Sequence, residues 1–113
     1  MKLARVVGTV VSTRKDEKLE GLKFYLMQDL GKDLQGKDSL VVAADAVGCG
    51  VGEIVLYASG SSARQTTATD KRPCDATVMA IVDVIDGKDG ARIFDKSSDG
   101  PLGADSRGTD DGW

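Results

Sequence analysis

Side chains that commonly carry out chemistry are sparse in this chain of 113 residues, which contains no histidine. Histidine is the commonest general base and metal ligand, so its absence removes the familiar nucleophile–histidine triads. The two cysteines, Cys49 and Cys74, are too far apart and too isolated from carboxylates to match zinc-ligand spacing. Asp83 and Asp86 lie three positions apart on an expected strand, so their carboxylates would point to opposite faces. The sequence therefore predicts a protein that is not an enzyme and that holds no metal and no cofactor.

A glycine-rich run, Gly48-Cys49-Gly50-Val51-Gly52, raises the possibility of a nucleotide-binding loop. Its spacing is one residue short of the dinucleotide-binding fingerprint. It also leads into the strand-like segment Ile54–Ala58 and not into a helix, so no helix N-terminus follows it to hold a phosphate. Glycines at this spacing instead permit positive φ angles or a close approach of backbones. We expect such an approach where several chains meet at a rotation axis.

The elements around these residues are expected to be short strands. Six segments combine β-branched or aromatic residues with turn signals at their ends. They are Leu3–Thr13, Lys23–Asp29, Ser39–Ala44, Ile54–Ala58, Thr77–Asp86 and Ala91–Asp95. Gly31–Asp38 is expected to be a polar loop, and Ser59–Arg64 a helical turn capped by Ser61 or Ser62. The pattern predicts an all-β fold, an OB-like five-stranded antiparallel barrel with a short helix and an extra C-terminal strand.

Two of these strands make more specific predictions about packing. The first strand is apolar on both faces, with Leu3, Val7 and Val11 on one and Val6 and Val10 on the other. We therefore expect the barrel core to cover one face and another chain to cover the second. In the strand Thr77–Asp86, Val82 is expected on the face that the core covers.

Composition places the chain among globular proteins, with 41% hydrophobic and 29% charged residues. The net charge of −3 and the pI near 4.8 oppose non-specific attraction to nucleic acid or to an anionic membrane. The longest apolar runs, such as Leu40–Ala44, are too short to span a bilayer. Because Met1-Lys2-Leu3 leads directly into a strand, no signal peptide is expected, and the cysteines are expected to be free thiols in the cytoplasm.

The composition changes near residue 96, which predicts two parts. Residues 1–95 are expected to form the barrel domain, and residues 96–113 a flexible, acidic, glycine-rich tail. The tail ends in the only tryptophan of the chain, Trp113. This residue is either incidental or a side chain that docks on a neighbouring molecule.

An OB-like barrel also suggests a second hypothesis, an oligomeric module that binds single-stranded nucleic acid or another small ligand. Single-strand binding needs aromatic side chains that stack bases in a basic groove. The chain has five aromatic residues, which are Phe24, Tyr25, Tyr57, Phe94 and Trp113. Phe24 and Tyr25 alternate faces, so both cannot line one groove. Together with the acidic pI, this predicts no nucleic-acid partner.

Four blocks of the sequence resemble the EutN/CcmL family of bacterial microcompartment vertex proteins. They are Gly8–Thr13 (GTVVST), Val42–Leu56 (VAADAVGCGVGEIVL), Gly60–Arg64 (GSSAR), and Pro73–Thr77 (PCDAT) together with Ala80–Asp83 (AIVD). Their order and spacing match the family, and the likeness covers residues 1 to about 95. It does not extend to the tail.

The resemblance implies a structural shell subunit in the cytoplasm, without cofactor or substrate turnover. Members of the family form cyclic pentamers of OB-like barrels that cap the five-fold vertices of a protein shell, whose facets are tiled by hexameric shell proteins. The expected partners are therefore copies of the chain itself and such hexamers. The matching motifs place a subunit interface or axial pore at Gly48, Gly50, Gly52, Glu53, Ser61, Ser62 and Arg64. Cys49 and Cys74 are expected to be packing residues.

Overall fold

The computed structural model describes residues 1–97, which hold seven strands and three short 3-10 helices. In chain order these are β1 (Lys2–Val10), η1 (Glu17–Leu19), β2 (Phe24–Leu30), β3 (Gly36–Asp45), β4 (Ile54–Ser59), η2 (Gly60–Arg64), β5 (Ala76–Ile81), β6 (Val84–Asp86), η3 (Lys88–Gly90) and β7 (Arg92–Asp95). The expected tail, apart from Lys96 and Ser97, lies outside the described residues, and so does Trp113.

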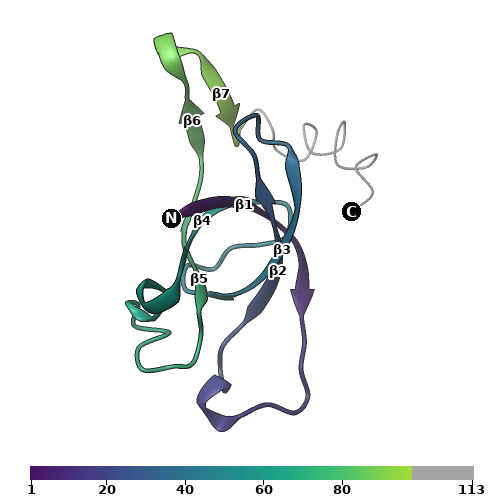
Figure 1. Ribbon diagram of the computed structural model, residues 1–113, viewed down its shortest axis with the longest axis vertical. Coiled ribbons are helices and arrows are strands. Elements are labelled where there is room, and N and C mark those ends of the chain that lie inside the picture. The colour runs from purple at the N-terminus through teal and green to yellow at the C-terminus, as the bar shows by residue number, and fades with distance from the viewer. Residues whose placement is uncertain (98–113) are drawn as a thin grey trace. The chain divides into compact units, whose positions relative to one another are not determined.

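Five strands close a barrel in the order β1-β2-β3-β5-β4 (Figure 1). This confirms the predicted all-β barrel. One pair differs from the prediction, because β3 and β5 run parallel while the other four pairs are antiparallel. Strand directions must alternate around an antiparallel ring, so a closed ring with an odd number of strands contains at least one parallel pair. The barrel is therefore mixed.

The chain divides after Ile81 into two compact units, Met1–Ile81 and Val82–Trp113. The first holds the barrel, and the described part of the second holds the antiparallel hairpin of β6 and β7. The single strand expected over Thr77–Asp86 is therefore wrong, because pairing in the barrel ends at Ile81. Val82 lies outside both strands and is only partly buried, so its expected place in the core is also wrong.

Strand β3 begins at Gly36, three residues earlier than the sequence indicated. The connection from β2 is a tight turn in which the Gly31 amide donates to the Gln35 carbonyl, and the Asp33 carboxylate accepts from the Gln35 amide. Leu34 takes a φ of 64° in this turn. The Gln28 side chain then donates to the Lys37 carbonyl across the pair at 2.9 Å. Residues 31–35 of the expected polar loop thus form the turn, and Gly36–Asp38 belong to the exposed start of β3.

The barrel core consists of small and medium side chains from all five strands and from Cys49. These are Ala4, Val6, Met27, Ala43, Cys49, Val55, Tyr57, Ala76 and Val78. Alternation along each strand directs them inward. Burial of Cys49 agrees with the expected packing role of the two cysteines, and Cys74 is buried as well.

One carboxylate is nearly buried at the barrel wall. Asp29 accepts hydrogen bonds of 2.5 Å from the hydroxyls of both Tyr57 and Ser39. Burial alone would raise the pKa of Asp29, but these two bonds and the charges of Lys2 and Lys37 hold it below its ordinary value. Burial and the Asp29 carboxylate raise the pKa of Tyr57 to about 12. Asp29 is therefore ionised and Tyr57 neutral at physiological pH.

The helix η2 and the loop after it cover the outer side of β5. The Ala63 carbonyl accepts from the hydroxyls of Thr77 at 2.7 Å and Thr69 at 2.8 Å, and all three residues are buried. The predicted helical turn is confirmed, but its predicted cap is wrong. The N-cap residue is Ser59, whose side chain makes no capping hydrogen bond.

Candidate subunit interface

The connection from β3 to β4, residues 45–53, forms a rigid loop that we call the glycine loop. At its start the Asp45 carboxylate accepts from the backbone amides of Val47 at 3.0 Å, Gly48 at 3.0 and 3.1 Å, and Cys49 at 3.3 Å. An aspartate that binds backbone amides two to four residues ahead is a common way to fix a turn. One side chain therefore sets the path of the first half of the loop.

The second half of the loop is joined to β1. The Gly52 amide donates to the Val6 carbonyl at 2.7 Å, and the Val6 amide donates to the Glu53 carbonyl at 2.9 Å. The Arg5 guanidinium also donates to the Gly52 carbonyl at 2.9 Å. Within the loop, the Glu53 carboxylate accepts from the Gly50 amide at 2.6 Å. One contact of Glu53 therefore holds the loop geometry.

The three glycines of the loop have different structural roles. Gly48 and Gly52 have φ angles of 79° and 95°, which side chains with a Cβ rarely adopt. Gly50 has no positive φ, and a Cβ built there would meet Glu53 only at an ordinary 3.6 Å. The backbone conformation of the subunit therefore explains why glycine occupies positions 48 and 52. At Gly50 the subunit leaves room for a Cβ.

The loop presents apolar side chains to solvent and hides its thiol. Val47 is 40% exposed and Val51 56% exposed, whereas Cys49 is buried in the core. Burial, followed by the nearby Asp45 carboxylate, raises the pKa of the Cys49 thiol to about 12. A thiol that stays protonated at neutral pH is a poor nucleophile and a poor metal ligand. The loop is thus suited to packing and not to chemistry.

The other predicted interface residues lie on η2. Ser61, Ser62 and Arg64 are all exposed. Arg64 donates from Nη1 to the Cys74 carbonyl at 3.3 Å, and the Gly60 amide donates to the Asp75 carbonyl at 2.9 Å. These bonds join η2 to the segment entering β5, not to the glycine loop.

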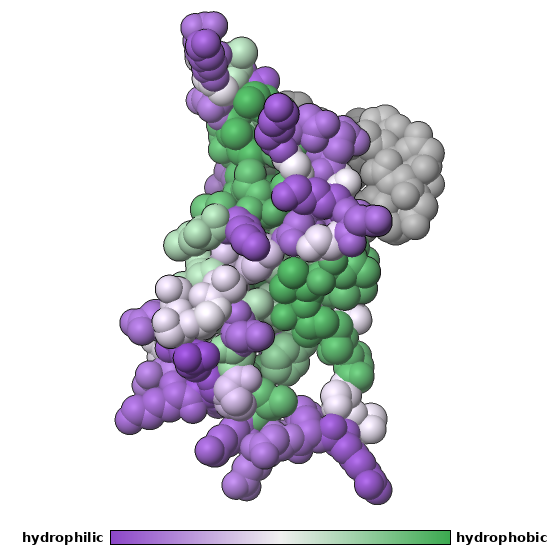
Figure 2. Space-filling model, viewed as in Figure 1, coloured by the Kyte–Doolittle hydropathy of each residue, from purple (hydrophilic) through white to green (hydrophobic). Residues whose placement is uncertain are grey.

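An apolar outer face on β1, β2 and β3 was only partly anticipated. Residues directly opposite on neighbouring strands share a face, and two such pairs are Val10 with Phe24 and Leu26 with Val42. Leu40 continues the face along β3 and is 60% exposed. The space-filling view shows hydrophobic surface gathered over these strands (Figure 2). The sequence predicted a second apolar face for the first strand, but its placement of Val6 and Val10 on one face is wrong. A β-bulge between Val6 and Gly8 shifts the register, so Val6 lies in the core and Val10 lies opposite Phe24 on the outer face. The continuation of this face across β2 and β3 was not predicted.

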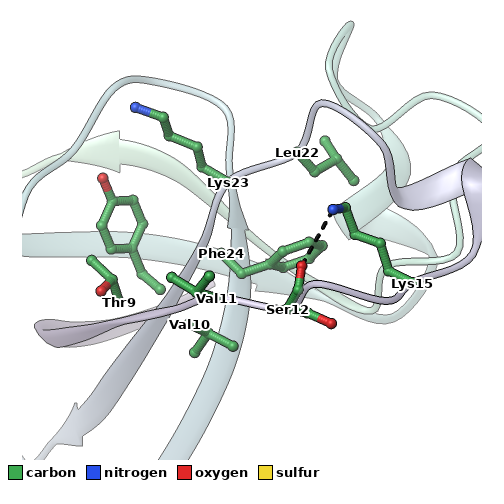
Figure 3. A pocket seen from close by; sticks show the side chains of 9 residues that line it. Thr9, Val10, Val11, Ser12, Lys15, Leu22, Lys23 and Phe24 are labelled. Atoms are coloured by element: carbon green, nitrogen blue, oxygen red, sulfur yellow. Dashed lines mark hydrogen bonds between the residues drawn. The ribbon is translucent and has the colours of Figure 1, made fainter.

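An open pocket of about 380 Å³ borders this outer face where β1 ends and β2 begins (Figure 3). Its lining residues are Thr9, Val10, Val11, Ser12, Lys15, Leu22, Lys23, Phe24 and Tyr25. Val10, Val11 and Phe24 lie at its centre, with Lys15 and Lys23 on either side. The Lys15 ammonium donates to the Ser12 carbonyl at 3.4 Å. The pocket combines an apolar floor with two cations.

Among residues 1–97, no three side chains of histidine, cysteine, aspartate or glutamate lie close enough together to hold a metal ion. No helix within that range has the length and apolarity needed to cross a membrane.

Comparison with known proteins identifies the family. The family described as "Ethanolamine utilisation protein EutN/carboxysome" matches residues 1–83. The chain belongs to the EutN/CcmL family. It is 44% identical over 96 residues to the carboxysome shell vertex protein CcmL of Thermosynechococcus vestitus, an alignment that covers 85% of this chain and 96% of that protein.

Solved structures of EutN/CcmL proteins share the fold. The structure of Gloeobacter violaceus CcmL aligns with a TM-score of 0.81 at 41% identity, over 86% of this chain and 99% of that one. The pentameric microcompartment shell protein GrpN of Rhodospirillum rubrum aligns with a TM-score of 0.71 at 44% identity, over 77% of this chain and 99% of that one. This chain is thus longer than these relatives.

Proposed function

We propose that this protein is a structural shell subunit whose homopentamer caps the five-fold vertices of a bacterial microcompartment in the cytoplasm. The similarity to shell vertex proteins, including one described as pentameric, supports this role. The pentamer would be surrounded by hexameric shell proteins and would need no cofactor, substrate or nucleic acid. The observation in this chain that carries the proposal is the apolar outer face of β1–β3, which a lone barrel would leave in water.

A cyclic ring of identical subunits requires two different surfaces on each copy, because the contacts run head to tail. The outer face of β1–β3 is one apolar surface, and the glycine loop with Val47 and Val51 exposed is another. A rigid loop loses little conformational entropy when a neighbour packs on it. We therefore keep the seven predicted residues as the proposed subunit interface or axial pore: Gly48, Gly50, Gly52, Glu53, Ser61, Ser62 and Arg64.

Native mass spectrometry, with size-exclusion chromatography and light scattering, tests the assembly. The expected mass is five times the 11.9 kDa of the chain. A monomer, or a closed ring of another size, would contradict the proposal. The hexameric partner is tested separately by mixing the purified ring with a hexameric shell protein and looking for closed particles by electron microscopy.

Substitution at Gly50 tests the interface without straining the subunit. Because Gly50 has an ordinary φ and room for a Cβ, Gly50→Val should leave the barrel folded and act only where another chain approaches. We expect loss of the pentamer with a retained strand-type circular dichroism spectrum. Ala68→Val, which adds the same branch on an exposed loop, is the matched control and should stay pentameric. An intact Gly50→Val pentamer would refute a packing role for this glycine.

Two of the described aromatic residues, Tyr57 and Phe94, are buried and cannot stack on bases. Phe24 and Tyr25 line one pocket together with Lys15 and Lys23, so the expectation that both rings cannot line one groove is wrong. The net charge of −3 still opposes binding of nucleic acid. Stacking on single strands requires accessible rings along a basic groove. We expect no oligonucleotide retention in a filter-binding assay at low salt.

A further inference from the structure

We propose that the pocket beside β1 and β2 receives the C-terminal segment around Trp113 of a neighbouring copy, so that the tail fastens one subunit of the ring to the next. The inference rests on the proposed ring, because the pocket borders the outer face that we expect to meet the neighbour. It concerns residues 98–113, which lie beyond the residues 1–83 that the family match covers.

The charge of the chain supports this occupant. Residues 98–113 contain four aspartates and one arginine, so the whole net charge of −3 resides in them and residues 1–97 are formally neutral. Among residues 1–97, the only charged side chains lining the pocket are Lys15 and Lys23. Opposite charges increase the rate of encounter and fix the orientation of the bound segment. The proposal pairs Asp110 and Asp111 with the two ammonium groups.

The apolar floor of the pocket fits the other distinctive residue of the tail. Val11 is 85% exposed, and Val10 and Phe24 lie beside it at the centre of the pocket (Figure 3). A tryptophan buries roughly 150–250 Å² on docking and prefers aromatic neighbours such as phenylalanine. Asp110 and Asp111 precede Trp113 by three and two positions, within about 10 Å along an extended chain. An aromatic side chain with nearby carboxylates matches an apolar floor flanked by two lysines.

The length of the tail is comparable with the size of a barrel. Sixteen residues follow Ser97. A chain of sixteen residues spans about 50 Å when fully extended, and a glycine-rich random coil of that length would have a root-mean-square span of about 20–24 Å. A barrel unit of this size has a radius of gyration near 12 Å. The average span of the tail is thus comparable with the width of one subunit.

Intrinsic fluorescence tests the docking directly, because Trp113 is the only tryptophan. In the full-length protein we expect its emission at shorter wavelength than in denaturant, with reduced quenching by acrylamide. Val11→Asp should move the emission to the solvated wavelength, because it places a like charge beside the acidic tail. Val84→Asp, on the exposed apolar position of β6, is the matched control and should leave the emission unchanged. A solvated wild-type emission, or equal effects of the two variants, overturns the proposal.

A charge exchange tests the two lysines. Lys15→Glu together with Lys23→Glu should release Trp113, and adding Asp110→Lys and Asp111→Lys should restore the shorter-wavelength emission. Failure of this rescue overturns the assigned orientation. Native mass spectrometry of each variant reports the ring separately from the docked tail. A monomeric variant that keeps the shorter-wavelength emission would show that the tail binds its own barrel, which overturns the link between subunits and leaves the proposed ring untouched. If Val11→Asp instead abolishes the ring while Trp113 in the wild type is solvated, a neighbouring barrel fills the pocket and the tail proposal fails.

Mixed rings show which copy supplies the tail. Val11→Asp chains retain the tryptophan but lack a working pocket, and Trp113→Phe chains retain the pocket but lack the tryptophan. Neither chain alone should show docked emission. When the two are co-expressed, docking on a neighbour restores the shorter-wavelength emission. Absence of recovery, with docked emission in the wild type, shows that the tail binds its own barrel and overturns the proposed link between subunits.

Discussion

Asp45→Ala removes the side chain that sets the glycine loop, and its cost can be worked out from the structure. Three backbone amides, those of Val47, Gly48 and Cys49, donate to this carboxylate. Hydrogen bonds to charged groups contribute about 1.5–3 kcal/mol each when no water replaces them. Val47 and Gly48 are exposed, so water can satisfy their amides, whereas Cys49 is buried. We therefore expect a total loss of about 2 kcal/mol of unfolding free energy, dominated by the buried amide.

Thermal and urea unfolding at one fixed protomer concentration measure this loss, since ring formation makes stability depend on concentration. For a domain of this size, about 2 kcal/mol corresponds to a fall in Tm of roughly 8–16 °C. Asp45→Asn keeps one acceptor oxygen and should lose about half as much. Asp38→Ala, at an exposed position on the same strand, is the matched control. The Cys49 thiol should also react faster with a thiol reagent in Asp45→Ala. If Asp45→Ala and Asp38→Ala have the same Tm, the Asp45 carboxylate does not fix the conformation of the glycine loop.

Two further predictions concern the core and its titration. Val78 is fully buried, so Val78→Asp should abolish cooperative melting. Val82 is only partly buried, so Val82→Asp should lower the free energy of unfolding by no more than about 1 kcal/mol. A larger loss for Val82→Asp than for Val78→Asp would contradict the division at Ile81. Because the pKa of Tyr57 is raised, the neutral hydroxyl contributes fully to the free energy of unfolding below pH 10. This contribution is lost as the pH rises toward about 12. The shift corresponds to about 3 kcal/mol at most. Because Cys49 titrates in the same range, the difference between wild type and Tyr57→Phe isolates Tyr57. A pH-independent difference between pH 9 and 12 would show that Tyr57 does not titrate as described.

Alternating apolar residues were sufficient to predict the strands that the core requires, but not where each strand stops. The first half of β3 is exposed and polar around Lys37 and Asp38, so it lacks the apolar period that identifies a strand. Apolar alternation continues past Ile81 into Val82 and Val84. Pairing nevertheless ends there, because Ile81 lies opposite Val55 and β4 begins only one residue before Val55. Strand ends depend on the length of the partner, which local sequence does not encode.

The candidate site shows a similar division. Glycine in a tight connection predicted the unusual backbone at Gly48 and Gly52, and the structure gives both positive φ angles. The role of Asp45 was missed, although an aspartate three residues before a glycine at a strand end is a recognisable turn signal. The outer face around Leu26 and Val42 was missed for another reason. When a strand is apolar on both faces, alternation alone cannot tell which face enters the core.

The parallel pair of β3 and β5 implies an order of events as the chain is synthesised. Strands β1, β2 and β3 form an antiparallel meander from one continuous stretch, Lys2–Asp45, whereas closing the barrel joins Ala44 to Thr77. Contacts between residues close in sequence form faster than those that close long loops, and the N-terminal part leaves the ribosome first. The apolar outer face is therefore formed while the inner face of the same three strands still lacks the side chains of β4 and β5 that pack against it in the finished barrel. Until β5 arrives, the nascent subunit is a sheet that is apolar on both sides, and this interval is when copies made on neighbouring ribosomes are most exposed to mispairing.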